Sequence, residues 1–444
     1  AWANWISLVT LVPMEAVAAV QYMSSWPWSW ANWTKNFIKN GDITFEGIGV
    51  VFIFMLIFTM INFWSVKIMT HFTNLISIFK ILLPTLTIVT LICSGFHEHN
   101  FGTNIHEFMP YGSRSIFEAT SVSGIIMSYD AFQTIINMGG ELKNPRKNIV
   151  RGVLISMLIT AAIYIMLQVT FIGAVEPSML AKVGWHGIDF TSPFADLAIL
   201  MGINWLVILL YLDAFVSPFG TGVAFVATAS RALAAMTHTR HLPKWLGRIN
   251  QKYMIPRYAM ATDLILAVIL VSLFRNWNLL ATVITASTLI AYLTGPVTVM
   301  TLRKIRPDLA RPFKPRYMPW LAPIAFVLTS LAIYWSMWPT TIQVILVIAL
   351  GLPIYFYYEI RYQHSDLKKQ LHNCWWMIGY LIFMSFMSYI GSNGFGGQNW
   401  IKYPFDFVVI IVVSLLFYYW GVKSGRDQLD PYAEHIKKNK NKQK

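Results

Sequence analysis

The chain has 444 residues, of which 56% are hydrophobic, 15% aromatic and only 12% charged, and its formal net charge is +14. This composition excludes an ordinary soluble domain and predicts an all-α membrane protein. The two cysteines, Cys93 and Cys374, each lie alone in an apolar run, so we expect neither a disulfide framework nor a metal site. No cofactor-binding motif is evident, and we expect no cofactor.

Apolar runs long enough to cross a bilayer recur along the whole chain. A crossing takes about 20 apolar residues, and windows of that length predict about twelve transmembrane helices. They are centred on residues 5–23, 45–64, 72–94, 119–138, 150–175, 205–227, 258–274, 279–302, 320–338, 343–358, 375–390 and 405–420. The expected organisation is a transmembrane domain over residues 1–422 and a basic cytoplasmic tail over residues 423–444.

The basic residues give the expected orientation. Most of the 34 Lys and Arg residues fall in loops on one side of the predicted helices. Basic loops stay in the cytoplasm, which places the C-terminus there and explains the net charge without nucleic acid. We therefore expect a multi-pass protein of the inner or plasma membrane. The chain begins almost in hydrocarbon, at Ala1 without a charged flank, and we expect a truncated start.

Four charged residues lie inside predicted spans: Glu15, Lys80, Asp130 and Asp213. Such a charge costs at least ~2.5 kcal/mol near the bilayer centre unless protein or water surrounds it. Lys80 lies too deep to reach the interface, so we expect it to face the bundle interior, where a desolvated lysine readily exchanges a proton. The alternative is a structural amine paired with a carboxylate such as Asp213. Glu15 is interpreted mainly as a bridge between helices.

The stretch "YLDAFVSPFGTGVAF" places polar groups on one helix face. Asp213, Ser217 and Thr221 recur at i, i+4 and i+8, and Pro218 removes an amide from the same helix. Such a face suits a cavity wall or an ion site. A packing seam of small residues between helices is the competing interpretation.

Polar residues also interrupt the apolar run "GIIMSYDAFQTIINMGGELKNP". Ser128, Tyr129 and Asp130 stand in a row, followed by Gln133. The pattern predicts a broken helix whose free N–H and C=O groups bind the carboxylate and ammonium ends of a zwitterion. A continuous helix with one polar face remains the alternative.

Three segments resemble a known family. "GGELKNPRKNI", "SRALAAMTHTRHLPKWL" and "RKIRPDLARPFKPR" follow in order on predicted cytoplasmic ends, and they are similar to amino acid permeases of the amino acid-polyamine-organocation superfamily. The resemblance implies a LeuT-type inverted-repeat fold with a truncated first repeat, because the first span here matches the family's third helix. It places substrate binding at the unwound sixth helix, on Ser128, Tyr129, Asp130, Ala131 and Phe132, with Gln133 just beyond.

The resemblance also assigns an ion site. It places the lysine of proton-coupled members on Lys80, and ligands of sodium-dependent relatives on Ser217 and Thr221, beside Asp213. Two departures stand out: Ala131 occupies a position that is usually glycine, and the family's first helix is missing. We expect Asp130 to orient the break rather than to bind substrate.

The resulting prediction is a secondary active transporter that moves amino acids by alternating access, through proton-coupled symport or exchange at Lys80. Alternatives are an exchanger of polyamines or other amines, a transport-inactive fragment, and a channel-like membrane protein. An enzyme is not expected, since no nucleophile and base are paired at helical spacing. The "HEH" at residues 97–99 is interpreted as a solvated external turn rather than as a metal site.

Overall fold

The computed structural model describes residues 1–64, 66–122, 124–130, 132, 144–188, 190–238, 242–250, 253, 255–308, 311, 314–362 and 367–425. These residues form two compact units. The first comprises Ala1, Trp5–Ala119 and Ser123–Ile284, and the second comprises Trp2–Asn4, Thr120–Val122 and Thr285–Lys444.

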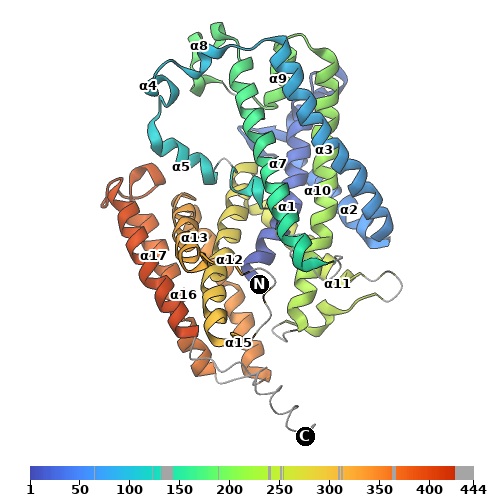
Figure 1. Ribbon diagram of the computed structural model, residues 1–444. Coiled ribbons are helices and arrows are strands. Elements are labelled where there is room, and N and C mark those ends of the chain that lie inside the picture. Colours follow the sequence, from blue (N-terminus) through green and yellow to red (C-terminus); the bar gives the residue numbers. More distant parts are fainter. Residues whose placement is uncertain are drawn as a thin grey trace. The chain divides into compact units, whose positions relative to one another are not determined.

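Long helices dominate the first unit (Figure 1). They are α1 (Trp2–Ser24), α2 (Phe45–Trp64), α3 (Val66–Ser94), α5 (Gly112–Val122), α7 (Pro145–Ala174), α10 (Asn204–His238), α11 (Arg257–Leu273) and the first part of α12 (Trp277–Ile305). The helix α10 packs against α2, α3, α9 and α11. It therefore holds much of this unit together.

Short elements connect these helices. They are η1 (Ser29–Phe37), β1 (Ile38–Lys39), β2 (Asp42–Ile43), η2 (Glu98–Phe101), α4 (Ile105–Phe108), η3 (Met127–Tyr129), α8 (Pro177–Val183), η4 (Trp185–Gly187), α9 (Pro193–Leu200) and η5 (Lys244–Gly247). The strands β1 and β2 pair antiparallel, with Ile38 opposite Ile43. Both turn residues between them, Asn40 and Gly41, have positive φ, as tight hairpins require.

The helices differ in what surrounds them. In α1, 83% of the most apolar window is buried, whereas none of the corresponding window of α7 is buried. The core around α1 also contains residues of α2, α10, α11 and α12, and Figure 1 shows the dark blue α1 among the helices of this unit. A helix that is apolar all round can lie either in a protein core or in a lipid bilayer. Here α1 is enclosed by protein, whereas the described residues leave the apolar side chains of α7 uncovered.

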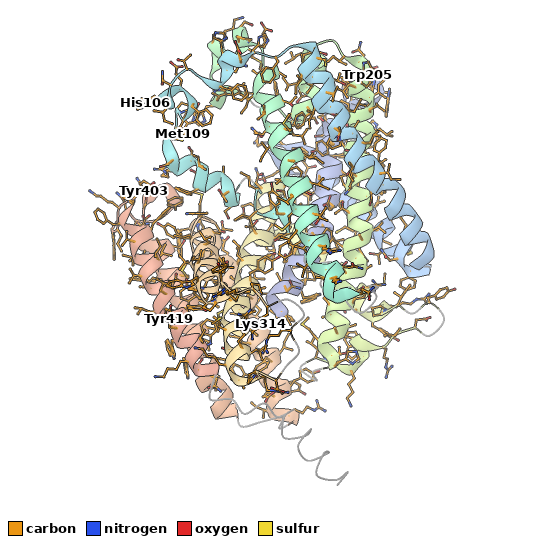
Figure 2. The ribbon with its side chains drawn as sticks, viewed as in Figure 1. His106, Met109, Trp205, Lys314, Tyr403 and Tyr419 are labelled. Atoms are coloured by element: carbon orange, nitrogen blue, oxygen red, sulfur yellow. The ribbon has the colours of Figure 1, made fainter. Side chains whose placement is uncertain are left out.

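The second unit contains the rest of α12 together with α13 (Met318–Tyr334), α14 (Thr340–Ala349), α15 (Gly351–Tyr362), α16 (Leu367–Ile390), η6 (Asn393–Phe395) and α17 (Phe405–Ser424). The helices α13, α16 and α17 pack on one another around Phe326, Tyr380 and Tyr418. Exposed aromatic side chains cover the outside of both units: Figure 2 labels Tyr419 of α17, which is 62% exposed, and Trp205 of α10.

The described residues include eight helices that are long and apolar enough to cross a membrane. A shorter apolar helix, α13, and the helices α11 and α16 occupy further predicted spans. This confirms a multi-pass, all-helical membrane protein. Within the described residues of the predicted span at 119–138, α5 ends at Val122 and the short helix η3 follows at Met127–Tyr129.

Candidate functional site

A cavity of about 620 Å³ lies in the first unit, between α1, α3, α10 and the start of α12. Its volume is in the range of small-molecule sites. Most of its wall is apolar side chains, and six polar side chains carry the argument that follows: Glu15, Tyr22, Lys80, Asp213, Ser217 and Thr221. The four residues predicted as an ion site therefore share one cavity.

Lys80 and Thr221 meet across two helices. The Lys80 ammonium group on α3 donates a hydrogen bond to Oγ1 of Thr221 on α10. The Thr221 hydroxyl donates in turn to the Ser217 carbonyl, at 3.1 Å. Close approach of the helices makes this possible, since a Cβ at Gly220 would lie 2.6 Å from the side chain of Ile76 on α3. A larger residue at position 220 would push the two helices apart.

Two carboxylates face the same cavity. Glu15 of α1 and Asp213 of α10 each interact electrostatically with the Lys80 ammonium group and with the phenol of Tyr22. Neither carboxylate makes a hydrogen bond or ion pair with the part of the chain that the structure describes, and the Oδ1 atom of Asp213 is buried without a partner. The interpretation of Glu15 as a helix bridge is therefore supported by its electrostatic interaction with Lys80 on α3 but by no hydrogen bond or ion pair among these residues.

Pro218 modifies the cavity wall on α10. A proline inside a helix donates no hydrogen bond to the carbonyl four residues earlier, which here belongs to Ala214. Ala214 and Pro218 both line the cavity. The backbone carbonyl of Ala214 therefore lacks the amide donor that a regular helix supplies.

The interruption after α5 begins at Gly124. This residue has φ +78°, a conformation that favours glycine. The amides of Ser128, Tyr129 and Asp130 then donate to the carbonyls of Gly124, Ile126 and Met127, at 2.9, 3.1 and 3.0 Å. A new helical turn therefore starts at Gly124, and the side chain of Met127 within this turn lines the cavity.

The predicted substrate-binding residues lie next to this turn. The Ser128 hydroxyl donates to the Ile125 carbonyl at 2.7 Å, and the Tyr129 ring packs edge-on against Tyr164. Asp130 is only 5% exposed, and Phe132 is half-buried. Ser128, Tyr129, Asp130 and Phe132 do not line the cavity. Ala131 and Gln133 lie outside the described residues.

Hydrogen bonds connect the segments at the end of the cavity near α9. The hydroxyl groups of Ser25 and Ser192 are 2.7 Å apart, and the Tyr211 hydroxyl donates to the Ser25 carbonyl at 3.0 Å. The Ser192 amide donates to Oδ2 of Asp196, also at 3.0 Å. Burial raises the pKa of the Asp196 carboxyl, and the bond from Ser192 opposes that rise. The segment before α9 is thus tied to α1 and α10.

No role was predicted for Tyr22 and Trp277, which line the cavity, or for Gly124 at the break. Tyr22 lies seven residues after Glu15, on the same face of α1, and this spacing could have indicated it. Trp277 packs over the break, since a Cβ at Gly124 would lie 3.4 Å from its indole ring. Gly124 stands in the apolar run itself, where the glycine was a visible signal for the interruption.

Comparison with known proteins gives a consistent picture. The family model described as amino acid permease matches residues 1–349. The glutamate/serine transporter AimA of Bacillus subtilis is 47% identical over 96% of this chain and 78% of its own length. The aspartate-proton symporter of the same organism is 32% identical over 95% of this chain and 80% of its own length. The branched-chain amino acid permease BcaP, also from B. subtilis, is 24% identical over 72% of this chain and 65% of its own length.

Proposed function

Because the chain belongs to the amino acid permease family, we propose that it moves small polar or acidic amino acids across the membrane by alternating access, with a proton as the coupling ion. Relatives named as a glutamate/serine transporter and an aspartate-proton symporter support both parts of this proposal. Glutamate, aspartate and serine are the substrates to test first.

The observation that carries the proton coupling is the contact of Lys80 with Thr221 inside a cavity that also holds Glu15 and Asp213. The affinity of an ammonium group for its proton depends on the groups around it. The lysine side chain links α3 to α10, so movement of these helices alters its surroundings directly. Proton binding at Lys80 would thereby favour one arrangement of the helices.

Substrate recognition involves the break that starts at Gly124. The first amides of a new helical turn have no partner within that turn and attract a carboxylate. We assign this role to the amides near Met127, because the amides of Ser128 and Tyr129 already donate within the turn. Ser128, Tyr129 and Phe132 stay substrate-binding residues in this proposal on the basis of the family resemblance, with Asp130 orienting the break. The positions Ala131 and Gln133 belong to the same proposal on the basis of the sequence.

The remaining features follow the family resemblance. We propose twelve transmembrane helices in residues 1–422, a LeuT-type fold, a plasma or inner membrane location, and a basic cytoplasmic tail at residues 423–444. Both symport and exchange agree with the cavity. Efflux driven by unlabelled amino acid on the opposite side would distinguish exchange from symport.

Uptake into proteoliposomes tests the proposal. We expect labelled glutamate, aspartate or serine to accumulate when the outside is acidified, and to saturate with concentration. Lys80→Met should keep substrate binding but lose the dependence of uptake on pH. Lys182→Met, which removes an exposed lysine on α8, is the matched control and should behave like the original protein. Unchanged pH dependence in Lys80→Met would refute the role of this lysine, and non-saturating flux would refute the transporter itself.

A further inference from the structure

The short helix η5 between α10 and α11 packs closely on both of them. Leu246 within η5 is buried, and so is Leu242 just before it. A Cβ at Gly247 would overlap the side chain of Thr237 on α10, so the backbone of η5 lies directly against that helix. The side chains that η5 leaves exposed are therefore carried by a backbone that is packed in place.

Exposed aromatic and basic side chains share one side of this segment. The amide of Arg248 donates to the Trp245 carbonyl at 3.2 Å, a 3₁₀-type hydrogen bond that brings side chains three residues apart onto the same side. Trp245 is 46% exposed, and Lys244, Arg248 and Ile249 are exposed as well. The Trp245 ring packs edge-on against Tyr258, with the ring centroids 6.0 Å apart.

The lengths of the flanking helices place this aromatic pair at the level of the lipid headgroups. The 17 residues of α11 are about 26 Å long, close to the ~30 Å of a hydrocarbon core, and Tyr258 lies in the first turn. The 35 residues of α10 are about 52 Å long, so this helix extends beyond the hydrocarbon; Figure 1 shows it beside α11. Trp and Tyr are enriched at the membrane interface.

The charge of the segment is entirely basic. Residues 214–262 contain six Lys or Arg residues and no Asp or Glu. Arg257 is engaged with protein, because its guanidinium donates to the Phe63 carbonyl of α2 at 3.1 Å and lies over the Phe63 ring. Lys244 and Arg248 extend from η5 and from the residue after it, and both are exposed. These two side chains present positive charge beside the aromatic pair.

We propose that Lys244, Trp245 and Arg248, with Ile249 and Tyr258 beside them, form a binding site for the headgroup of an anionic phospholipid. The ammonium and guanidinium groups bind the phosphate. The aromatic rings and Ile249 lie at the start of the acyl chains, where amphipathic rings are favoured. A soluble polyanion would use the two basic groups but not the exposed apolar ones, and this combination favours a lipid.

The expected orientation agrees with this ligand. The basic loops place this end of α10 in the cytoplasm, where the membrane leaflet carries anionic lipids. A lipid bound here would hold the ends of α10 and α11 at headgroup level. The site goes beyond the proposed transport function and does not depend on which solute crosses the membrane.

Native mass spectrometry of the purified full protein in detergent tests the site by counting bound lipids. The protein is titrated with phosphatidylglycerol or with zwitterionic phosphatidylcholine. We expect the original protein to bind phosphatidylglycerol more tightly. The double variant Lys244→Gln/Arg248→Gln should bind one phosphatidylglycerol fewer at low lipid concentration, because its affinity at this site falls about twentyfold to thirtyfold, or about fivefold for each basic residue.

Three further variants make the result specific. Arg114→Gln/Lys182→Gln removes two exposed basic residues of α5 and α8, which is the same change in net charge, and it should bind lipid like the original protein. Arg248→Lys keeps the charge and should keep most of the affinity. Trp245→Ala keeps both charges but should weaken phosphatidylglycerol binding. Thermal midpoints of all variants are compared so that unfolding is not mistaken for lost binding.

Four outcomes would overturn the inference. The first is an unchanged lipid count in Lys244→Gln/Arg248→Gln, and the second is an equal loss in the control variant, which would show an effect of net charge alone. The third is equal affinity of the original protein for phosphatidylcholine. The fourth is full affinity in Trp245→Ala together with displacement of the lipid by inorganic phosphate, which would show a site for a soluble anion.

Discussion

Replacing Gly124 by alanine should lower the free energy of unfolding, because of backbone strain rather than a steric clash of the new side chain. Gly124 has φ +78°, and an L-residue with a side chain loses about 1–2 kcal/mol in the left-handed region. Alanine also reduces the conformational entropy of the unfolded chain, which stabilises the folded state by about 0.4–1 kcal/mol. A Cβ at this position would lie 3.4 Å from the Trp277 ring, an ordinary van der Waals distance. The net loss is therefore on the order of 1 kcal/mol.

Thermal unfolding of the detergent-solubilised protein, followed by intrinsic fluorescence at one scan rate, measures this loss. About 1 kcal/mol corresponds to a decrease of roughly 1 °C in a chain of 444 residues. Gly124→Asn should fall between glycine and alanine, because asparagine tolerates positive φ better. Uptake should decrease in the same order.

Gly49→Ala is the matched control. Gly49 lies inside α2, and a Cβ there would meet nothing within 4 Å. Alanine in an exposed helix should stabilise by about 0.5–1 kcal/mol, so the two glycine-to-alanine changes should shift the midpoint in opposite directions. Equal shifts for Gly124→Ala and Gly49→Ala would show that positive φ at the break is not required.

Other regions give further tests. Gly222→Ala should destabilise by about 1–3 kcal/mol, since its Cβ would lie 2.4 Å from a phenylalanine ring of α2; an unchanged thermal midpoint would contradict the close packing of α2 and α10. Tyr334→Phe removes the hydroxyl that donates to the fully buried Asp406 at 2.7 Å, and we expect a loss of about 1–3 kcal/mol, seen as faster hydrogen exchange in α13 and α17. Hydrogen bonds from the backbone amide and the hydroxyl of Thr103 lower the pKa of Glu107. Their local stabilisation is thus present above the usual pKa of a glutamate and disappears as the pH falls through the lowered value. Thr103→Val should raise that pKa part of the way back, and an unshifted carboxyl titration by carbon-13 NMR would contradict this.

Much of the helical structure could be predicted from the sequence, because an apolar run of membrane length has few alternatives. The shared face of Asp213, Ser217 and Thr221 followed from helical periodicity, and the depth of Lys80 indicated that it points inward. The cavity brings these four residues together. The importance of Glu15 could not be judged from the sequence, because its neighbours on α3 and α10 are far away along the chain.

The position of the helix interruption after α5 could be predicted only approximately from the sequence. Ser128, Tyr129 and Asp130 marked the region correctly by their polarity, but the backbone turns earlier, at Gly124. A glycine in an apolar run is compatible with either sign of φ, and packing against Trp277 is not encoded locally. The departure noted at Ala131 concerns a residue outside the described chain, so its role stays a prediction.

The enclosure of α1 has a consequence for biosynthesis. Its buried surface is completed by α10, α11 and the start of α12, which leave the ribosome some 200 residues later. At about 5–20 residues per second, α1 waits roughly 10–40 s for these partners, with Ser7, Thr10 and Glu15 not yet covered. During this time the helix must be held by the insertion machinery or by α2, which contributes to the same core. Slowed synthesis between α3 and α10 would prolong this exposure and increase degradation of the nascent protein.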